Sequence, residues 1–320
     1  MKYFPKKLTM TWIRNSYKEG SLTPEELAGE IVRRAEKYRD YNIWIVAPDL
    51  KRMMDYIEKL PKDMESLPLW GIPFAVKDNI DVAGSPTTAA CPDYAYDPEE
   101  DAAVVKKLIE AGAFPVGKTN LDQFATGLVG TRSPYGEVKN ALDPELISGG
   151  SSSGSAVSVA LGMAAFSLGT DTAGSGRVPA ALNCLVGYKP SLGAWSTKGV
   201  VPACASLDCV TVFANSLEDA EKVNLAARGV DEECCWSREY KEPLPKLPKK
   251  ICLAKDGVTF YGPYEDIYKA KWEQAKKRIE DMGITVEYID YTMFSKAASI
   301  LYDGPWVAER WKDLGDFVES

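Results

Sequence analysis

The sequence predicts an α/β fold built around a largely parallel or mixed β-sheet. From residue 71 onward, short apolar runs alternate with segments of helical length, which is the pattern of strands and helices in such folds. Candidate capping residues begin several of the helical segments. A chain of 320 residues is also long enough to bury a sizeable core, in one domain or two.

The N-terminal segment, residues 1–65, is expected to be helical and to pack on the core. Thr23, Pro24 and Glu26 form a capping box with proline at the first helical position. The apolar residues that follow share one helical face: Leu27, Ile31, Val32 and Ala35.

The middle of the chain, residues 66–228, is expected to form the core. The predicted strands are residues 74–76, 114–116, 166–168 and 185–188. The predicted helices run from a cap at Asp101 to Gly112, over residues 153–165, and from a cap formed by Ser216 and Asp219 to Ala227.

The last part, residues 229–320, is expected to continue the α/β pattern within one structural domain overall. A charged, proline-rich linker or surface excursion is predicted at residues 229–249. A strand at 251–254, an amphipathic helix at 264–282 and a strand at 285–289 follow.

Charge and composition exclude several classes of function. The formal net charge of −8 argues against nonspecific nucleic-acid binding and against docking on an anionic membrane, because both need clustered basic residues. The most apolar stretch, residues 155–168, is too short to span a bilayer. The seven cysteines show no paired metal-binding spacing, so we expect reduced thiols, no metal and a cytoplasmic protein.

Two segments rich in glycine and serine carry the candidate chemistry. Residues 149–155 are Gly-Gly-Ser-Ser-Ser-Gly-Ser, and residues 169–177 are Gly-Thr-Asp-Thr-Ala-Gly-Ser-Gly-Arg. These serines suggest a nucleophile, but the chain contains no histidine, which excludes a Ser-His-Asp arrangement. Lys77 follows an apolar run and is the candidate base, because burial lowers the pKa of a lysine.

Each segment also has a noncatalytic interpretation. Residues 149–155 have the composition of a flexible linker, or of an anion-binding loop at a helix N-terminus, although the ending of a nucleotide P-loop is missing. Residues 169–175 fit a tight turn after a strand. The same turn lets backbone N–H groups converge, as an oxyanion hole requires.

The sequence resembles the amidase signature family of serine amidohydrolases. The matching segments occur in family order, at residues 71–80, 117–120, 149–155, 169–179 and 187–190. The resemblance implies a central mixed β-sheet flanked by α-helices on both faces. It also implies a Ser–cis-Ser–Lys triad that needs no metal or organic cofactor.

The resemblance gives each matching residue a role. Ser175 would be the nucleophile, Ser151 the middle serine with a cis peptide bond to Gly150, and Lys77 the terminal base. Backbone N–H groups would form the oxyanion hole at Thr172, Ala173, Gly174 and Ser175.

Four neighbouring residues are expected to support this triad. Ser152 and Ser153 would assist by hydrogen bonding or would cap the next helix. Asp171 and Arg177 would form a structural ion pair rather than transfer protons.

Residues 200–209 and 301–310 resemble one branch of the family, the allophanate hydrolases. This implies release of ammonia from allophanate (urea-1-carboxylate), a small anionic amide of urea breakdown. A guanidinium suits its carboxylate, and the resemblance gives that contact to Arg310, with a hydroxyl from Tyr302 and a backbone contact from Gly127. On a single helix, Tyr302 and Arg310 would lie about two turns apart on similar faces.

Other interpretations stay open. For residues 301–310, the alternative is a surface amphipathic helix with a solvated arginine and a core tyrosine. The chain would otherwise be a general small-amide amidase, the glutaminase subunit of a tRNA amidotransferase, or an inactive amidase-fold protein that binds a partner. Family cores usually continue past residue 320, so we expect a fragment or a shortened member. Dimers are common in the family, which makes a homodimer a further expectation.

Overall fold

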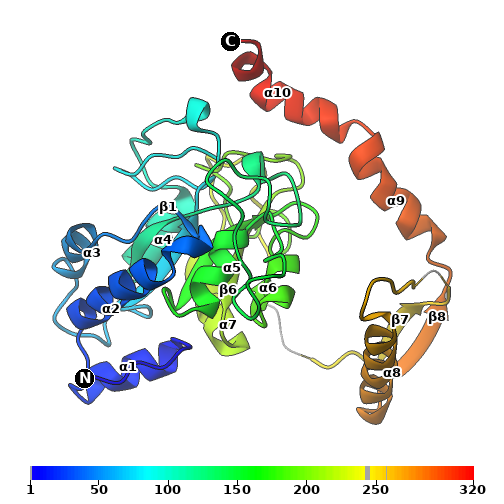
Figure 1. Cartoon of the computed structure of the whole chain (residues 1–320), viewed down its shortest axis with the longest axis horizontal. Helices are drawn as coiled ribbons and strands as arrows, with labels where there is room; N and C mark the ends of the chain where they lie inside the picture. The colour runs from blue at the N-terminus through cyan, green and yellow to red at the C-terminus, as the bar shows by residue number, and fades with distance from the viewer. Residues whose placement is uncertain (1, 242–245, 257) are drawn as a thin grey trace. The chain divides into compact units, whose positions relative to one another are not determined.

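The computed structural model describes residues 2–241, 246–256 and 258–320. They form two compact units (Figure 1): one contains the chain up to Tyr240 together with Asp316–Ser320, and the other is Lys241–Gly315. This division differs from the expected single domain, and its boundary lies beyond residue 229. The physical reason is that the last two strands pair with each other in a separate two-stranded sheet.

A six-stranded mixed sheet forms the centre of the larger unit, in the order β1-β3-β2-β4-β6-β5. Its strands are β1 (Trp44–Val46), β2 (Ile72–Lys77), β3 (Ala113–Thr119), β4 (Phe166–Asp171), β5 (Val186–Tyr188) and β6 (Cys209–Ala214). β2 is parallel to β3 and β4, whereas β1 and β6 are antiparallel to their neighbours. Every residue of β2, β4 and β6 is buried, so helices and loops cover both faces there. The predicted α/β class is confirmed.

Seven α-helices belong to the described part of this unit before residue 241. They are α1 (Met10–Lys18), α2 (Pro24–Lys37), α3 (Leu50–Ile57), α4 (Ala103–Glu110), α5 (Ser153–Ala160), α6 (Val178–Leu182) and α7 (Leu217–Ala227). Short 3-10 helices lie at Arg39–Tyr41, Pro92–Tyr94 and Gln123–Ala125.

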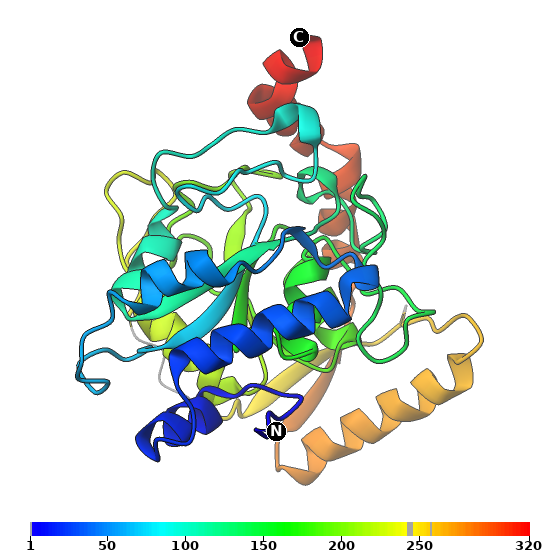
Figure 2. The same ribbon diagram turned by 60° about the vertical axis from the view of Figure 1, so that its left-hand side comes forward.

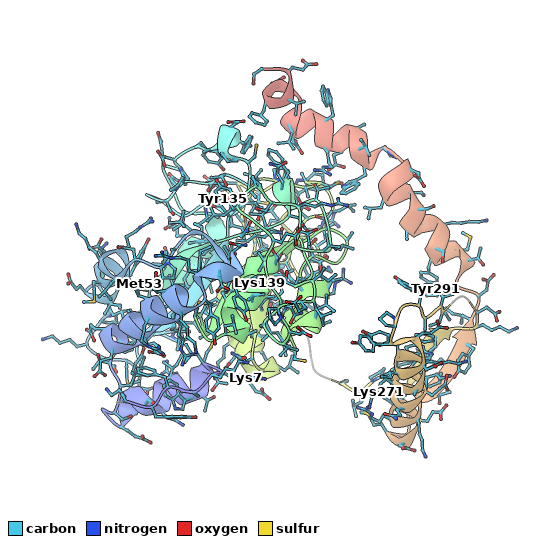
Figure 3. All side chains as sticks on the ribbon, in the orientation of Figure 1. Lys7, Met53, Tyr135, Lys139, Lys271 and Tyr291 are labelled. Atoms are coloured by element: carbon cyan, nitrogen blue, oxygen red, sulfur yellow. The ribbon has the colours of Figure 1, made fainter. Side chains whose placement is uncertain are left out.

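The N-terminal helices begin where the sequence predicts and pack on the sheet. In the capping box of α2, the Thr23 hydroxyl accepts the Glu26 N–H at 3.3 Å, and the Glu26 carboxylate accepts the Thr23 N–H at 2.9 Å. α2 and α3 lie side by side (Figures 1 and 2), and α3 contacts β3. Met53 of α3 (Figure 3) is fully buried.

Two predicted helix ends are wrong. Asp101 does not cap α4, because its carboxylate accepts the Ala83 N–H at 2.8 Å and the helix begins after Ala102 without a side-chain cap. α5 ends at Ala160 rather than at residue 165, because Gly162 takes a φ of 71° that a helix does not tolerate. The Ser216 cap of α7 is confirmed by the Asp219 N–H that its hydroxyl accepts at 3.1 Å.

Two strands were not expected from the sequence. β1 lies within the segment that we expect to be helical, and β6 lies between β4 and β5 in the sheet. The apolar and β-branched run of β6, directly before the Ser216 cap, is the signal that predicts a strand there.

The smaller unit begins with a parallel β-α-β element, as predicted. β7 (Lys250–Ala254) and β8 (Thr285–Ile289) are joined by α8 (Glu265–Asp281). α9 (Thr292–Asp303) and α10 (Trp306–Glu319) follow. Within the described residues, no helix combines the length and apolar character needed to cross a membrane.

Candidate active site

The candidate catalytic residues come from segments that meet at one edge of the central sheet. β2 and β4 are parallel neighbours, so their carboxyl ends lie at the same edge, where α/β folds place their ligand sites. Lys77 is the last residue of β2, and Thr170 and Asp171 end β4. Ser151 lies just before α5, and Ser175 lies in the turn between β4 and α6.

Lys77 is a buried amine. Its side chain is fully buried, and its Nζ lies 2.8 Å from Ser151 Oγ and 2.7 Å from Thr170 Oγ1. Burial lowers the pKa of Lys77 to about 7, against the opposing charges of three carboxylates, those of Asp122, Asp208 and Asp171. Near neutral pH, a large fraction of Lys77 is therefore the neutral amine, which is the form that accepts a proton.

The backbone around Ser151 fixes its hydroxyl beside Lys77. The peptide bond between Gly150 and Ser151 is cis, as the resemblance implies. The Ser151 carbonyl accepts the Asp122 N–H at 3.0 Å. A Cβ at Gly150 would collide with the Asp122 carboxylate, so this close approach of the chain requires glycine.

Ser152 and Ser153 tie the Ser151 segment to the sheet and do not cap α5, which has no side-chain cap. Ser152 Oγ donates to the Thr170 carbonyl at 3.1 Å and accepts the Thr170 N–H at 3.3 Å. Ser153 Oγ donates to the Asn120 carbonyl at 3.4 Å. These bonds support the first of the two roles that we expected for these serines.

Ser175 is nearly buried, and its hydroxyl is directed at a neighbouring loop. It is 4% exposed, and its Oγ donates to the Gly127 carbonyl at 3.4 Å. In the part of the chain that the structure describes, no hydrogen bond joins Ser175 to Ser151. The direct contact is therefore between Lys77 and Ser151, and transfer between the serines requires Ser175 to exchange Gly127 for Ser151 as its partner. Such bonds often tighten only when substrate is bound.

Asp171 holds the turn that carries Ser175. Its carboxylate accepts the N–H groups of Gly174 at 2.7 Å and Gly176 at 3.0 Å, and it pairs with Arg177 through two bonds of 2.9 Å. Burial on its own would raise the pKa of Asp171, but the hydrogen bonds and charge of Arg177 lower it. The expected structural ion pair is confirmed.

The same turn corrects one part of the expected oxyanion hole. The Gly174 N–H donates to Asp171 at 2.7 Å, so it is held by this carboxylate and does not face a reacting carbonyl in this structure. The backbone N–H groups of Thr172, Ala173 and Ser175 stay as the candidate donors.

A second buried carboxylate organises the loop that faces Ser175. Asp122 is fully buried and accepts three backbone N–H groups, those of Val129 at 3.3 Å, Gly130 at 3.1 Å and Arg132 at 2.9 Å. This loop contains Gly127, the partner of Ser175. A side chain at Gly127, where φ is 152°, would collide with Asp122, so the Gly127 backbone stays open to a small ligand.

The expected substrate-binding pair belongs to the smaller unit. Arg310 is half-buried on α10, with its guanidinium 5.3 Å from the centre of the Trp306 ring. The side chain of Tyr302 lies outside the described residues. The two residues lie on different helices, because α9 ends at Asp303 before Gly304 and Pro305, so the expectation of one shared helix is wrong. The contact of Arg310 with a substrate stays a prediction.

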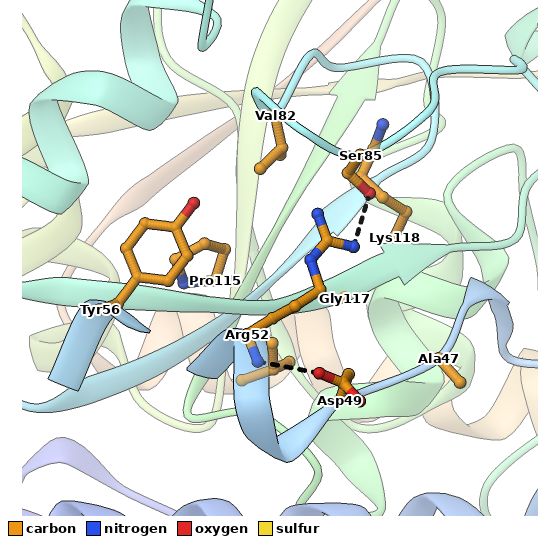
Figure 4. A pocket seen from close by; sticks show the side chains of 10 residues that line it. Ala47, Asp49, Arg52, Tyr56, Val82, Ser85, Pro115, Gly117 and Lys118 are labelled. Carbon is orange, nitrogen blue, oxygen red and sulfur yellow. Dashed lines mark hydrogen bonds between the residues drawn. The ribbon is translucent and has the colours of Figure 1, made fainter. Parts of the chain in front are cut away.

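A small pocket beside β3 has none of the predicted catalytic residues in its lining (Figure 4). Its walls include Arg52, Ser85 and Lys118, and its volume is about 20 Å³, which is room for about one water molecule. Lys118 Nζ lies 3.1 Å from Asp78 Oδ1 in a buried ion pair. Lys118 therefore fixes the chain that follows Lys77.

Sequence reasoning missed three polar residues that surround Lys77: Thr170, Asp122 and Asp208. Each lies at or beside the end of a buried strand or in a loop that follows one. Such positions carry no periodic pattern. The signal that points to them is a short polar residue directly after an apolar run, in a fold whose strand ends meet at one edge.

Comparisons with known proteins agree with this site. A sequence model of the family described as Amidase matches residues 26–317. The chain is 47% identical over 284 residues to the urea amidolyase of Saccharomyces cerevisiae, which covers 87% of this chain and 15% of that protein. It is 35% identical over 303 residues to a glutamyl-tRNA(Gln) amidotransferase subunit of Methanosarcina mazei, which covers 93% of this chain and 62% of that protein.

A solved structure also matches nearly the whole chain. The allophanate hydrolase of Kluyveromyces lactis superposes with a TM-score of 0.87 at 42% identity, over 98% of this chain and 52% of that one. The chain thus spans about half the length of that enzyme and a smaller share of the yeast urea amidolyase.

Proposed function

The chain belongs to the Amidase family, and from this premise we propose that it is a serine amidohydrolase that releases ammonia from allophanate. In this proposal Ser175 is the nucleophile, Ser151 passes the proton and Lys77 is the terminal base. The observation that carries it is the buried Lys77 amine, 2.8 Å from the Ser151 hydroxyl at the end of a central strand.

The hydrogen bonds of Lys77 support its role as a base. A neutral amine has two N–H groups and one lone pair. If one N–H donates to Thr170, 2.7 Å away, the lone pair is left for the proton of Ser151. Ser151 then accepts the proton of Ser175 as Ser175 attacks.

The bonds change in the following order. Ser175 Oγ forms a bond to the amide carbon, and the carbonyl oxygen becomes an oxyanion that the N–H groups of Thr172, Ala173 and Ser175 stabilise. The C–N bond breaks, and the proton held by Lys77 returns through Ser151 to the leaving nitrogen, which departs as ammonia. Water then attacks the acyl-enzyme with the same groups acting as base.

The choice of allophanate rests on the relatives and on the chemistry of Arg310. The relatives include a urea amidolyase and an allophanate hydrolase at 47% and 42% identity. Allophanate is small, flat and anionic, and a guanidinium binds a carboxylate through two parallel hydrogen bonds. We propose that Arg310 makes this contact and that Tyr302 adds a hydroxyl.

Ammonia release from allophanate, malonamate, biuret and glutamine tests the proposal. We expect allophanate to have the highest kcat/KM of the four. Equal rates on malonamate would remove the preference for allophanate, and no ammonia from any of the four amides would contradict the amidohydrolase assignment.

The glutaminase subunit of a tRNA amidotransferase is the second candidate. The 35% identity to one of these amidotransferase chains, over 93% of this chain, favours it. The net charge of −8 argues against contact with tRNA. Preferential hydrolysis of glutamine in the same assay would select this alternative.

The pH dependence of ammonia release follows from the pKa of Lys77. That pKa is lowered to about 7 by burial, and only the neutral amine accepts a proton. We therefore expect kcat/KM to rise as pH increases through about 7 and to fall below it, in a buffer series at constant ionic strength. A rate that stays flat between pH 5.5 and 9 would contradict a titrating base with this pKa.

The Arg310→Lys substitution tests substrate choice. Lysine keeps the charge but loses the paired geometry of the guanidinium, so kcat/KM for allophanate should fall by about 2–3 kcal/mol, or roughly a hundredfold. Hydrolysis of a neutral amide should change much less. Arg278→Lys on the exposed face of α8 is the matched control and should leave both rates unchanged. An unchanged ratio of allophanate to neutral-amide hydrolysis in Arg310→Lys would remove the proposed contact.

A further inference from the structure

A buried carboxylate that the proposed reaction does not use lies beside the oxyanion turn. Asp208 is 3% exposed and directly precedes β6. β6 pairs with β4 so that Cys209 lies opposite Asp171. The next residues along the two chains, Asp208 and Thr172, therefore face each other just beyond the end of the ladder, and the Thr172 hydroxyl donates to Asp208 Oδ1.

The second oxygen of Asp208 holds a different loop. Asp208 Oδ2 accepts the N–H groups of Ala203 at 2.8 Å and Cys204 at 3.1 Å. The Cys204 carbonyl in turn accepts the Asp208 N–H at 2.9 Å. The loop is thus folded around the carboxylate, which uses both of its oxygens.

This loop is also anchored on the strand that carries Lys77. The Val201 N–H donates to the Asn79 carbonyl at 2.8 Å, and Asn79 Nδ2 donates to the Val201 carbonyl at 2.9 Å. Asn79 is two residues beyond Lys77, at the end of β2. The loop therefore connects the end of β2, with the base, to the end of β4, with the oxyanion turn.

We propose that Asp208 is a positioning residue, which through Thr172 holds the backbone N–H groups of the oxyanion turn in the reacting geometry. We call the Asp208 carboxylate with its partners Thr172, Ala203 and Cys204 the Asp208 clamp. Asp171 holds the turn at Gly174 and Gly176, and the Asp208 clamp holds it at Thr172, so the donors between the two carboxylates are fixed from both ends. This inference rests on the proposed chemistry of Ser175.

The position of these N–H groups matters because an oxyanion hole acts by preorganisation. Donors that are already aligned need no reorganisation when the negative charge develops, and a misplacement of about 1 Å costs up to roughly a hundredfold in rate. Burial raises the pKa of Asp208, while the charge of Lys77 opposes that rise. The charge of Asp208 in turn raises the pKa of Lys77, so the clamp also acts on the base.

Two single variants and their combination test the clamp. Thr172→Val keeps the shape of the side chain but removes the hydroxyl. Asp208→Asn keeps the shape of the carboxylate but removes its charge and turns one acceptor into a donor at Thr172. Thr172→Ser restores the hydroxyl, and Asp219→Asn, a buried carboxylate that accepts the Met10 N–H at 3.1 Å, is the matched control.

The readout is the rate at which a fluorophosphonate modifies Ser175, scaled to the folded fraction measured by circular dichroism. The Ser175 oxygen bonds to phosphorus, fluoride leaves and the proton passes to the base, while the phosphoryl oxygen occupies the oxyanion hole. We expect a roughly 10- to 100-fold slower rate in Thr172→Val and in Asp208→Asn. The double variant should lose no more than the larger single loss, because both changes remove the same contact. Thr172→Ser should recover most of the loss, and Asp219→Asn should keep the original rate even where its unfolding temperature falls.

Three results would overturn the inference. The first is an unchanged rate in folded Thr172→Val, and the second is a double variant whose loss is the product of the two single losses. The third is a slowing in Asp219→Asn equal to that in Asp208→Asn, which would reveal a general loss of stability. If Asp208→Asn does not fold, the comparison of Thr172→Val with Thr172→Ser decides. No modification of Ser175 in the unsubstituted chain would instead contradict the proposed function, and the clamp with it.

Discussion

Ser175→Ala is expected to abolish ammonia release from allophanate. The proposed reaction begins with a bond from Ser175 Oγ to the amide carbon, and alanine has no atom that can make it. The neighbouring hydroxyl of Ser151 is engaged with Lys77 at 2.8 Å and does not replace it. Removal of a catalytic nucleophile typically lowers kcat by about 10⁶-fold, which places the variant below the detection limit of a coupled ammonia assay.

Ser167→Ala is the matched control for this variant. Ser167 is a fully buried serine on β4, and its hydroxyl donates to the Ala75 carbonyl at 3.1 Å. Its loss removes one buried hydrogen bond, at a cost of about 1 kcal/mol, and should leave kcat near the original value. Turnover that survives in Ser175→Ala, with the fold intact, would show that another group attacks the substrate.

Lys77→Met is expected to lower kcat while the fold becomes no less stable. Methionine fills most of the same volume but accepts no proton, and the loss of a general base typically costs about 10²- to 10⁴-fold in rate. The folded state holds the pKa of Lys77 near 7, below its ordinary value of 10.5. At pH 8, folding therefore requires Lys77 to give up a proton, which costs free energy. Methionine removes this cost, so the unfolding temperature should stay the same or rise.

Lys118→Met provides the contrast. Lys118 is also a fully buried lysine, but it lies 3.1 Å from Asp78 Oδ1. Its loss leaves a buried carboxylate without its partner, which typically destabilises a fold by about 3–5 kcal/mol. We expect Lys118→Met to lower the unfolding temperature, and Lys77→Met to lower the rate instead. A near-normal rate in Lys77→Met would contradict the proposed base, and with no histidine in the chain the serine mechanism itself would need revision.

The sequence allowed the strands that carry the site to be predicted, because their signal is local. The apolar runs before Lys77 and before Thr170 are continuous, and the structure shows β2 and β4 buried along their whole length. The serines lie in short segments whose glycines follow from close approach, as at Gly150. These features depend on residues next to one another in the chain.

The supporting residues could not be predicted in the same way, because their roles depend on strand pairing. Asp208 faces Thr172 only because β6 is antiparallel to β4 in a particular register, and β6 itself was not expected. Asp122 accepts N–H groups from residues seven to ten positions later, in a loop without a regular pattern. The break at Gly304 and Pro305 was missed because the apolar pattern continues on both sides of it.

The most direct test of the account is to locate the fluorophosphonate adduct by mass spectrometry in the unsubstituted chain and in Lys77→Met. The account predicts one adduct, on Ser175, which forms faster as pH rises through about 7, the pKa of Lys77. It predicts much slower labelling in Lys77→Met, without this pH dependence. An adduct on Ser151, or labelling of Ser175 at equal rates in the two proteins, would contradict the proposal that neutral Lys77 activates Ser175 through Ser151.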